Sequence, residues 1–199
     1  MSSERERLIV YLDAAELGER RPVATLTRWP GRKLIVEFLY VRSWLSGGSG
    51  FQLEPEFPLI EAPRFTNDRL PAILADAAPD LWGQRLMDHR AGRELDAWEH
   101  LLRVDDRTRM GALRLTRAVD GPFLSDDGAG IPPLTSLRTL QELARRVEDD
   151  PGSIRDDDVA RLLLAPGSSL GGVRPKATYV APDGSQWLAK FPSKSDRRD

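Results

Sequence analysis

The first 41 residues contain three short runs that are rich in β-branched and aromatic residues and are separated by turn residues. Apolar runs of this kind at close spacing predict strands, because an amphipathic helix needs a longer segment with an apolar repeat of about 3.6 residues. This part of the chain is therefore expected to form an antiparallel meander. FQLEPEF, further along, has the composition of a short irregular strand. The four segments are RLIVYL at 7–12, PVATLTRW at 22–29, KLIVEFLYV at 33–41 and FQLEPEF at 51–57.

The spacing of apolar residues changes after Asn67. Between 68 and 106 apolar residues recur at helical spacing, and Pro79 and Gly92 interrupt them. Because proline and glycine break or end helices, this segment predicts two or three short helices. The segment MGALRLTRA at 110–118 returns to the spacing of a strand. The chain is therefore expected to belong to the mixed α+β class.

A polar segment rich in Gly and Pro, at 120–133, is expected to be a linker. The segment after it, LTSLRTLQELARRVEDD, has an apolar stripe with Thr135 or Ser136 as N-cap, which predicts an amphipathic helix. The segment DDDVARLLLA at 156–165 begins with acidic residues, as a second short helix would. The last expected element is a hairpin, because Asp183-Gly184 is a strong turn signal between two apolar runs.

The amino-acid composition argues against some classes of binding partner. The 199 residues include 29 Lys and Arg against 31 Asp and Glu, a formal net charge of −2. A chain so close to neutrality has no strong overall attraction to nucleic acid or anionic lipid, and direct nucleic-acid binding is not expected. The absence of cysteine excludes disulfides and thiolate metal sites. The short apolar run near the N-terminus predicts neither a signal peptide nor a membrane span, so a soluble, cytoplasmic protein without a membrane partner is expected.

Histidines and acid clusters do not predict a metal centre. His89 and His100 are the only histidines, and neither has a second ligand of metal-binding type three or four residues away. The acid clusters EDD and RDDDV lie at expected helix ends, where helix capping and the helix dipole account for them. The alternative, a carboxylate site, has no further support in the sequence. No metal ligand is therefore predicted.

The stretch LAPGSSLGGVRPKATYVAPDGSQWLAKFPS at 164–193 carries the strongest functional signal. Glycine-rich backbone with serine hydroxyls can converge on an anion, although this loop matches neither the Walker nor the dinucleotide pattern. Lys190 follows in the next strand, and its neighbours Ala189 and Phe191 are apolar, which predicts a lysine on a largely buried strand in need of an anion. Two interpretations remain: a site for nucleotide phosphates, or an ordinary hairpin.

Several segments in order resemble the HipA family of serine/threonine kinase toxins from bacterial type II toxin–antitoxin modules. LPAILADAAPDLWGQRLMD and WEHLLRVDDRTRMGALRL resemble helical and turn segments of that family. PGSSLGGVRPKA and DGSQWLAKFPSKSD resemble its glycine-rich loop and its nucleotide-lysine strand. Asp105-Asp106 departs from the glycine and aspartate that the family often has there. The resemblance covers most of the chain.

The resemblance implies two domains and a set of site residues. Residues 1–120 would form the family's N-terminal subdomain of antiparallel strands and short helices, and 121–199 would begin a kinase-like N-lobe. ATP would bind with Mg²⁺ in the complete kinase, and Lys190 would contact the nucleotide. Ser169 would be the autophosphorylated serine, with Ser168 as the lesser candidate. The remaining ATP-binding residues implied are Leu170, Gly171, Gly172 and Val173.

The sequence lacks the pattern for the catalytic part of such a kinase. MDHRAG does not match the H-R-D catalytic loop, and SDDGAG is not a D-F-G magnesium motif, so no catalytic residue is assigned in this chain. The chain by itself is expected to be inactive. In the family, the intact enzyme phosphorylates an aminoacyl-tRNA synthetase, and a helix-turn-helix antitoxin from the same operon binds the toxin. Two functions stay open: the N-terminal part of such a kinase, or a non-catalytic module that binds and regulates a separate kinase subunit.

Overall fold

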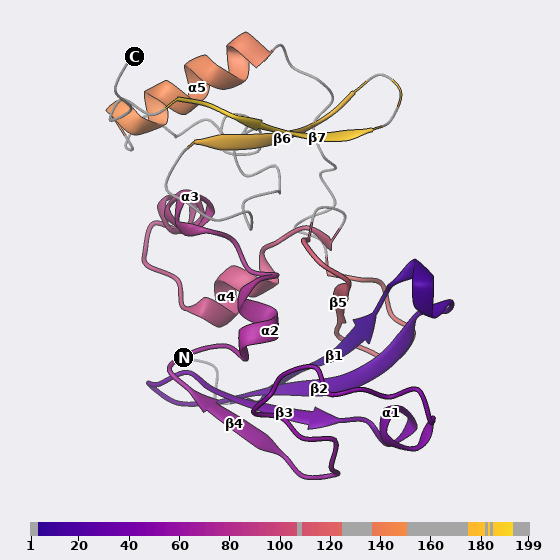
Figure 1. The fold of residues 1–199 in the computed structure, drawn as a ribbon. Helices are drawn as coiled ribbons and strands as arrows, with labels where there is room; N and C mark the ends of the chain where they lie inside the picture. The colour runs from indigo at the N-terminus through magenta and orange to yellow at the C-terminus, as the bar shows by residue number, and fades with distance from the viewer. Residues whose placement is uncertain are drawn as a thin grey trace. The chain divides into compact units, whose positions relative to one another are not determined.

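Figure 1 shows the fold in a computed structural model of the chain. The residues that the structure describes are 4–106, 109–124, 137–150, 175–181, 183 and 185–192. The chain divides into two compact units, each built from several segments. The expected domain boundary at residue 120 stays a prediction. The first unit comprises Met1–Ala77, Asp96–Leu102 and Met110–Leu124, and the second comprises Ala78–Leu95, Arg103–Arg109 and Ser125–Asp199.

The first unit contains a five-stranded sheet in the order β4-β3-β2-β1-β5, and every neighbouring pair is antiparallel (Figure 1). The three N-terminal strands form the expected meander. The segment at 110–118, whose apolar spacing predicted a strand, contains the fifth strand. This strand lies at the edge of the sheet beside β1. The strands are β1 (Glu6–Leu12), β2 (Arg21–Trp29), β3 (Ile35–Tyr40), β4 (Arg64–Asn67) and β5 (Leu113–Thr116).

Cross-strand rows of large apolar side chains form the core of this unit. Leu8 of β1 is opposite Leu26 of β2, which is opposite Phe38 of β3, and all three are fully buried. Directly opposed residues point to the same face of a sheet, so this row lies on one face. A shift of one residue in register would turn the row toward the other face, and burial of this row therefore fixes the register.

The segment 51–57 forms no strand, so the expectation of a short irregular strand there is wrong. The hydroxyl of Tyr40 takes over part of the hydrogen bonding that a neighbouring strand would supply. It accepts a hydrogen bond from the Leu53 amide at 2.9 Å and donates one to the Phe57 carbonyl at 3.1 Å. A side chain thus satisfies two backbone groups of this loop, and the strand forms further along the chain, at β4.

Short helices accompany the sheet in the first unit. α4 begins with a reciprocal capping box: the Glu99 amide donates to the Asp96 carboxylate at 2.9 Å, and the Asp96 amide donates to the Glu99 carboxylate at 3.1 Å. Trp98 and Leu101 of α4 are fully buried. The elements are a 3₁₀ turn (Ala15–Leu17), α1 (Arg42–Ser46), α2 (Ala72–Ala75) and α4 (Ala97–Leu102).

The second unit contains α3 (Leu81–Ala91), α5 (Leu137–Asp149) and a two-stranded sheet of β6 (Lys176–Val180) and β7 (Gln186–Lys190). α3 ends at Gly92, whose positive φ of 66° suits glycine, as the sequence predicted. With α2 and α4, it confirms three short helices between 68 and 106. The expected amphipathic helix is confirmed as α5, and the expected hairpin as β6–β7.

Several apolar side chains are buried in the second unit. Met87 of α3 forms a cluster with Leu95 and Val104. Leu143, Ala144 and Val147 are buried at helical spacing along α5. The second short helix expected at 156–165 lies outside the described residues. None of the helices in the described part of the chain combines the length and the apolar character that a membrane span needs.

Candidate functional site

The β6–β7 hairpin places two lysines directly opposite each other. In the antiparallel register Lys176 pairs with Lys190, and the Phe191 amide continues the ladder by donating to the Pro175 carbonyl at 2.8 Å. At the other end, the Asp183 carboxylate accepts hydrogen bonds from the amide and the hydroxyl of Ser185. Hydrogen bonds from Ser185 lower the pKa of the Asp183 carboxyl group, and the Asp183 carboxylate helps to fix the turn. The two lysines therefore lie at the open end of the hairpin.

Lys190 is exposed, which corrects the expectation that it lies on a largely buried strand. That expectation relied on the apolar neighbours Ala189 and Phe191. In a strand, however, adjacent residues point to opposite faces, so neighbours do not report the environment of the lysine itself. The described part of the chain contains no acidic side chain in an ion pair with Lys190. Its ammonium is thus accessible to an anion, and its part in ATP binding stays a prediction.

The buried lysine is Lys176, which forms an ion pair with Asp80. Their side chains are 2% and 3% exposed. Asp80 precedes α3 as its N-cap, and its second carboxylate oxygen accepts a hydrogen bond from the Gly83 amide at 3.0 Å. Asp80 directly follows Pro79, where the sequence predicts a break between helices, and no functional role was predicted for it. The available signal was an aspartate at a helix start, which predicts a cap, but no local pattern pairs it with a lysine 96 residues away.

The residues expected around the nucleotide phosphates fall outside the described part of the chain. They are Ser168, Ser169, Leu170, Gly171, Gly172 and Val173. Of the expected ATP-binding residues, Lys190 lies in the described part of the chain, and Lys176, to which the sequence assigned no role, is opposite it. The structure brings their backbones together in one strand pair, and it buries one of the two side chains.

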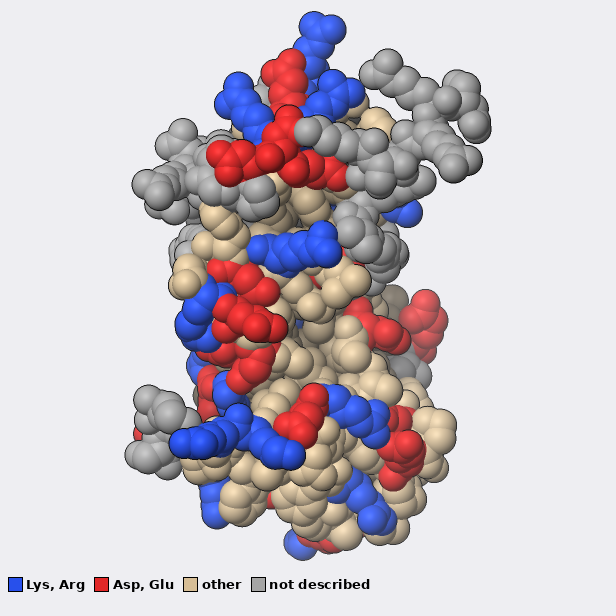
Figure 2. Space-filling view, turned by 90° about the vertical axis from the view of Figure 1, so that its left-hand side faces the viewer, with Lys and Arg blue, Asp and Glu red and all other residues tan. Residues whose placement is uncertain are grey.

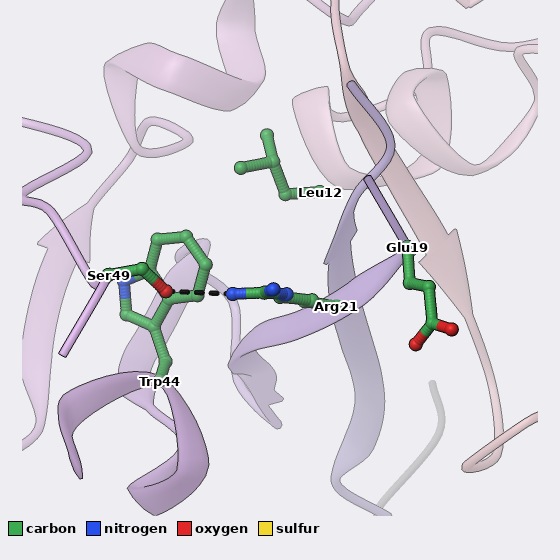
Figure 3. Close-up of a pocket in the computed structure, with 5 residues that line it drawn as sticks. All are labelled: Leu12, Glu19, Arg21, Trp44 and Ser49. Carbon is green, nitrogen blue, oxygen red and sulfur yellow. Dashed lines mark hydrogen bonds between the residues drawn. The ribbon is translucent and has the colours of Figure 1, made fainter. Parts of the chain in front are cut away.

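A small hollow in the first unit does not have the dimensions of a substrate site (Figure 3). It has room for about one water molecule. Arg21 crosses it and donates a hydrogen bond to the Ser49 hydroxyl at 2.7 Å. The guanidinium is thus engaged with a neighbour in the hollow. The residues that line it are Leu12, Glu19, Arg21, Trp44 and Ser49.

The charged side chains drawn in Figure 2 are of both signs and are interspersed. Exposed ion pairs such as Arg42–Glu61 at 2.7 Å and Arg69–Glu56 at 3.1 Å balance charges locally on the first unit. Hydrogen bonding to Glu61 raises the pKa of Arg42 further above its already high ordinary value. Among the described residues, no three histidine or acidic side chains gather as a metal centre would require.

Comparison with known families identifies the chain. The family description "HipA N-terminal domain" matches residues 15–116, just over half of the chain. The match runs from the 3₁₀ turn after β1 to the last residue of β5. No curated protein matches the chain in sequence. The resemblance drawn from short motifs is confirmed by this match. The chain belongs to the HipA family, and it carries the family's N-terminal domain.

Proposed function

We propose that this chain supplies the N-terminal part of a HipA-like serine/threonine kinase toxin. The family match supports the HipA-like toxin, and with it a toxin–antitoxin context. The observation that carries the kinase proposal is the exposed Lys190 ammonium, at the end of a hairpin that follows a glycine-rich loop. Such a lysine can bind nucleotide phosphates as a compact positive charge. Lys190 would then contact ATP in the complete kinase.

The proposed division of labour follows from the motifs in the sequence. Phosphoryl transfer needs an aspartate that positions the substrate hydroxyl, and acidic or amide side chains that hold Mg²⁺. The sequence has neither pattern, so these groups would come from a separate catalytic lobe. The loop at 168–173 would cover the phosphates with backbone amides. Phosphorylation of Ser169, or less favourably of Ser168, would add negative charge at that place and expel the loop.

The resemblance also supplies the proposed partners. The substrate would be a translation factor such as an aminoacyl-tRNA synthetase. A helix-turn-helix antitoxin from the same operon would bind the toxin. Both proposals rest on family membership.

The extent of the family match favours a second function. This function is a non-catalytic module that binds and regulates a separate kinase subunit. The match covers the N-terminal domain and ends at residue 116, before the glycine-rich loop. In this case the exposed Lys190 would have no part in phosphoryl transfer. A kinase subunit would then be active without this chain.

The two functions are distinguished by reconstitution. The reagents are this chain and the catalytic lobe encoded in frame after it or in the neighbouring gene, together called the completed kinase. Each part and the mixture are incubated with γ-labelled ATP and Mg²⁺. The kinase proposal predicts no phosphate incorporation by either part alone and incorporation by the completed kinase. Activity of the lobe alone would favour the regulatory module, and a neighbourhood that encodes no catalytic lobe would contradict the kinase proposal.

A further inference from the structure

Asp80 and Lys176 form an ion pair that is almost completely removed from solvent. Burying two charges is costly, and the attraction between them offsets the cost only where the geometry is good. Such a pair is therefore a costly way to stabilise a fold. Two packed apolar side chains at these positions would stabilise it at least as well. The pair joins residues 96 positions apart within the second unit.

The two oxygens of the Asp80 carboxylate have different partners. Oδ1 accepts the Gly83 amide hydrogen at 3.0 Å and so caps α3, and Oδ2 accepts from the Lys176 ammonium. The cap fixes the carboxylate on the first turn of an eleven-residue helix. A fixed carboxylate fixes the ammonium that it binds. Asp80 thereby holds the first residue of β6 at the start of α3.

Pairing of the two strand backbones links the position of Lys190 to that of Lys176. The two residues are direct partners in the strand pair, and the Phe191–Pro175 hydrogen bond closes the ladder immediately beyond them. Like charges directly opposite in a sheet repel each other. The negative charge of Asp80 offsets that of Lys176, which reduces the repulsion that Lys190 would otherwise meet.

We propose that Asp80 is a positioning residue for the phosphate-binding lysine, acting through Lys176. This inference rests on the proposed kinase function. Asp80 does not touch the nucleotide: it fixes β6 and balances Lys176, so that Lys190 alone at this end of the hairpin presents its charge to phosphate. Loss of the Asp80 charge releases β6 from α3. It also leaves less negative charge to offset the positive charge of Lys176.

The first test measures ATP kinetics of the completed kinase. Asp80→Asn retains a side chain that can cap a helix but removes the charge. We expect the KM for ATP to rise at least about tenfold, with kcat and the KM for the protein substrate changed less than about threefold. Asp76→Asn, at an exposed acidic residue just after α2, is the matched control and should change neither constant. An unchanged KM for ATP in a folded Asp80→Asn protein would overturn the proposal.

The second test uses the 199-residue chain and needs no activity. Amide hydrogen exchange should accelerate in β6 and β7 of Asp80→Asn and remain unchanged in β1–β5 of the first unit. The double variant Asp80→Asn with Lys176→Met carries no buried charge from either residue, and it should recover slow exchange in the hairpin. Unchanged hairpin exchange in Asp80→Asn would overturn the proposal. General unfolding of Asp80→Asn with no recovery in the double variant would also overturn it.

The two tests separate this inference from the proposed function. If Lys190→Met leaves phosphoryl transfer intact, the kinase role of Lys190 fails, and the positioning role fails with it. If Lys190→Met abolishes transfer but Asp80→Asn has no effect on the KM for ATP, only the positioning role fails.

Discussion

Lys176 and Lys190 are direct partners across the β6–β7 hairpin, yet Lys176 is buried at 2% exposure and Lys190 is exposed. Because the two residues are directly opposed, their side chains point to the same face of the sheet. The strand pairing alone would therefore predict the same exposure for both. The two lysines also differ in their ion pairs: Asp80, at the start of α3, pairs with Lys176, and no acidic side chain in the described part of the chain pairs with Lys190. Tertiary placement, rather than strand position, therefore gives the two lysines different environments.

The different burial of these lysines predicts different effects on stability. Lys176→Met leaves the Asp80 carboxylate buried without this cation, and we expect the free energy of unfolding of the second unit to fall by about 3 kcal/mol. Lys190→Met, the matched control on the opposite strand, should change it by less than about 0.5 kcal/mol. Urea unfolding followed by amide exchange in β6 and β7 measures both. Equal effects of the two substitutions would contradict the assignment of the buried charge to Lys176.

A partly buried hydrogen bond in the first unit is expected to contribute to its stability. The indole of Trp98 is fully buried, and its N–H donates to the Glu6 carboxylate at 2.8 Å. Trp98→Phe keeps an aromatic ring but removes the donor, and it should cost about 1.5 kcal/mol. Trp187→Phe removes an indole that is 56% exposed and should cost less than about 0.5 kcal/mol. Chemical denaturation of the three proteins checks the comparison, and a Trp98→Phe protein as stable as the parent would exclude this contribution.

Tyr40 predicts a loss of stability at alkaline pH. Burial, as the largest cause, raises the pKa of the Tyr40 hydroxyl; the Leu53 amide opposes the shift and the Glu54 carboxylate adds to it. The folded protein therefore keeps the proton more tightly than the unfolded chain. Its contribution is complete below a pH of about 10 and is lost as the pH rises from there through the folded pKa.

The corresponding measurement compares the parent with Tyr40→Phe between neutral pH and pH 11. Tyr40→Phe should be less stable at neutral pH, because it loses the bonds to Leu53 and Phe57, but its stability should fall less above a pH of about 10. Thermal unfolding at a series of pH values gives both slopes. Parallel slopes in the two proteins would show that Tyr40 does not titrate in the expected direction.

Phosphorylation of the glycine-rich loop predicts weaker nucleotide binding. Ser169→Asp places negative charge where the nucleotide phosphates are proposed to bind, and ATP affinity of the completed kinase should fall about tenfold. Ser43→Asp, in the exposed part of α1, serves as the control and should leave affinity unchanged. Equilibrium binding of labelled ATP provides the measurement. Unchanged affinity in Ser169→Asp would count against Ser169 as the regulatory serine.

Local sequence patterns predicted much of the fold because they report local physics. Short runs rich in β-branched and aromatic residues predicted β1–β3, and Gly92 predicted the end of α3, where the chain turns with positive φ. The error at 51–57 has a tertiary cause, since the Tyr40 hydroxyl satisfies backbone groups that a strand partner would otherwise bind. No local pattern contains that information.

The candidate site was predicted less well for the same reason. Lys190 was found through its strand and turn, but its burial was inferred from adjacent residues that face the other way. The Asp80–Lys176 ion pair joins residues that no sequence window contains together. Charge pairing over such a separation depends on how α3 and β6 are packed, which is a property of the folded unit.

The most direct test of the account is phosphoryl transfer by Lys190→Met in the completed kinase. The substitution keeps an unbranched side chain on β7 but removes the charge proposed to bind nucleotide phosphate. The matched control is Lys33→Met, which removes an exposed lysine of the first unit that pairs with Asp68 at 3.5 Å. Incorporation of γ-labelled phosphate is compared in the three proteins at equal concentration. The account predicts loss of incorporation in Lys190→Met and parental activity in Lys33→Met; parental activity in a folded Lys190→Met protein would contradict it.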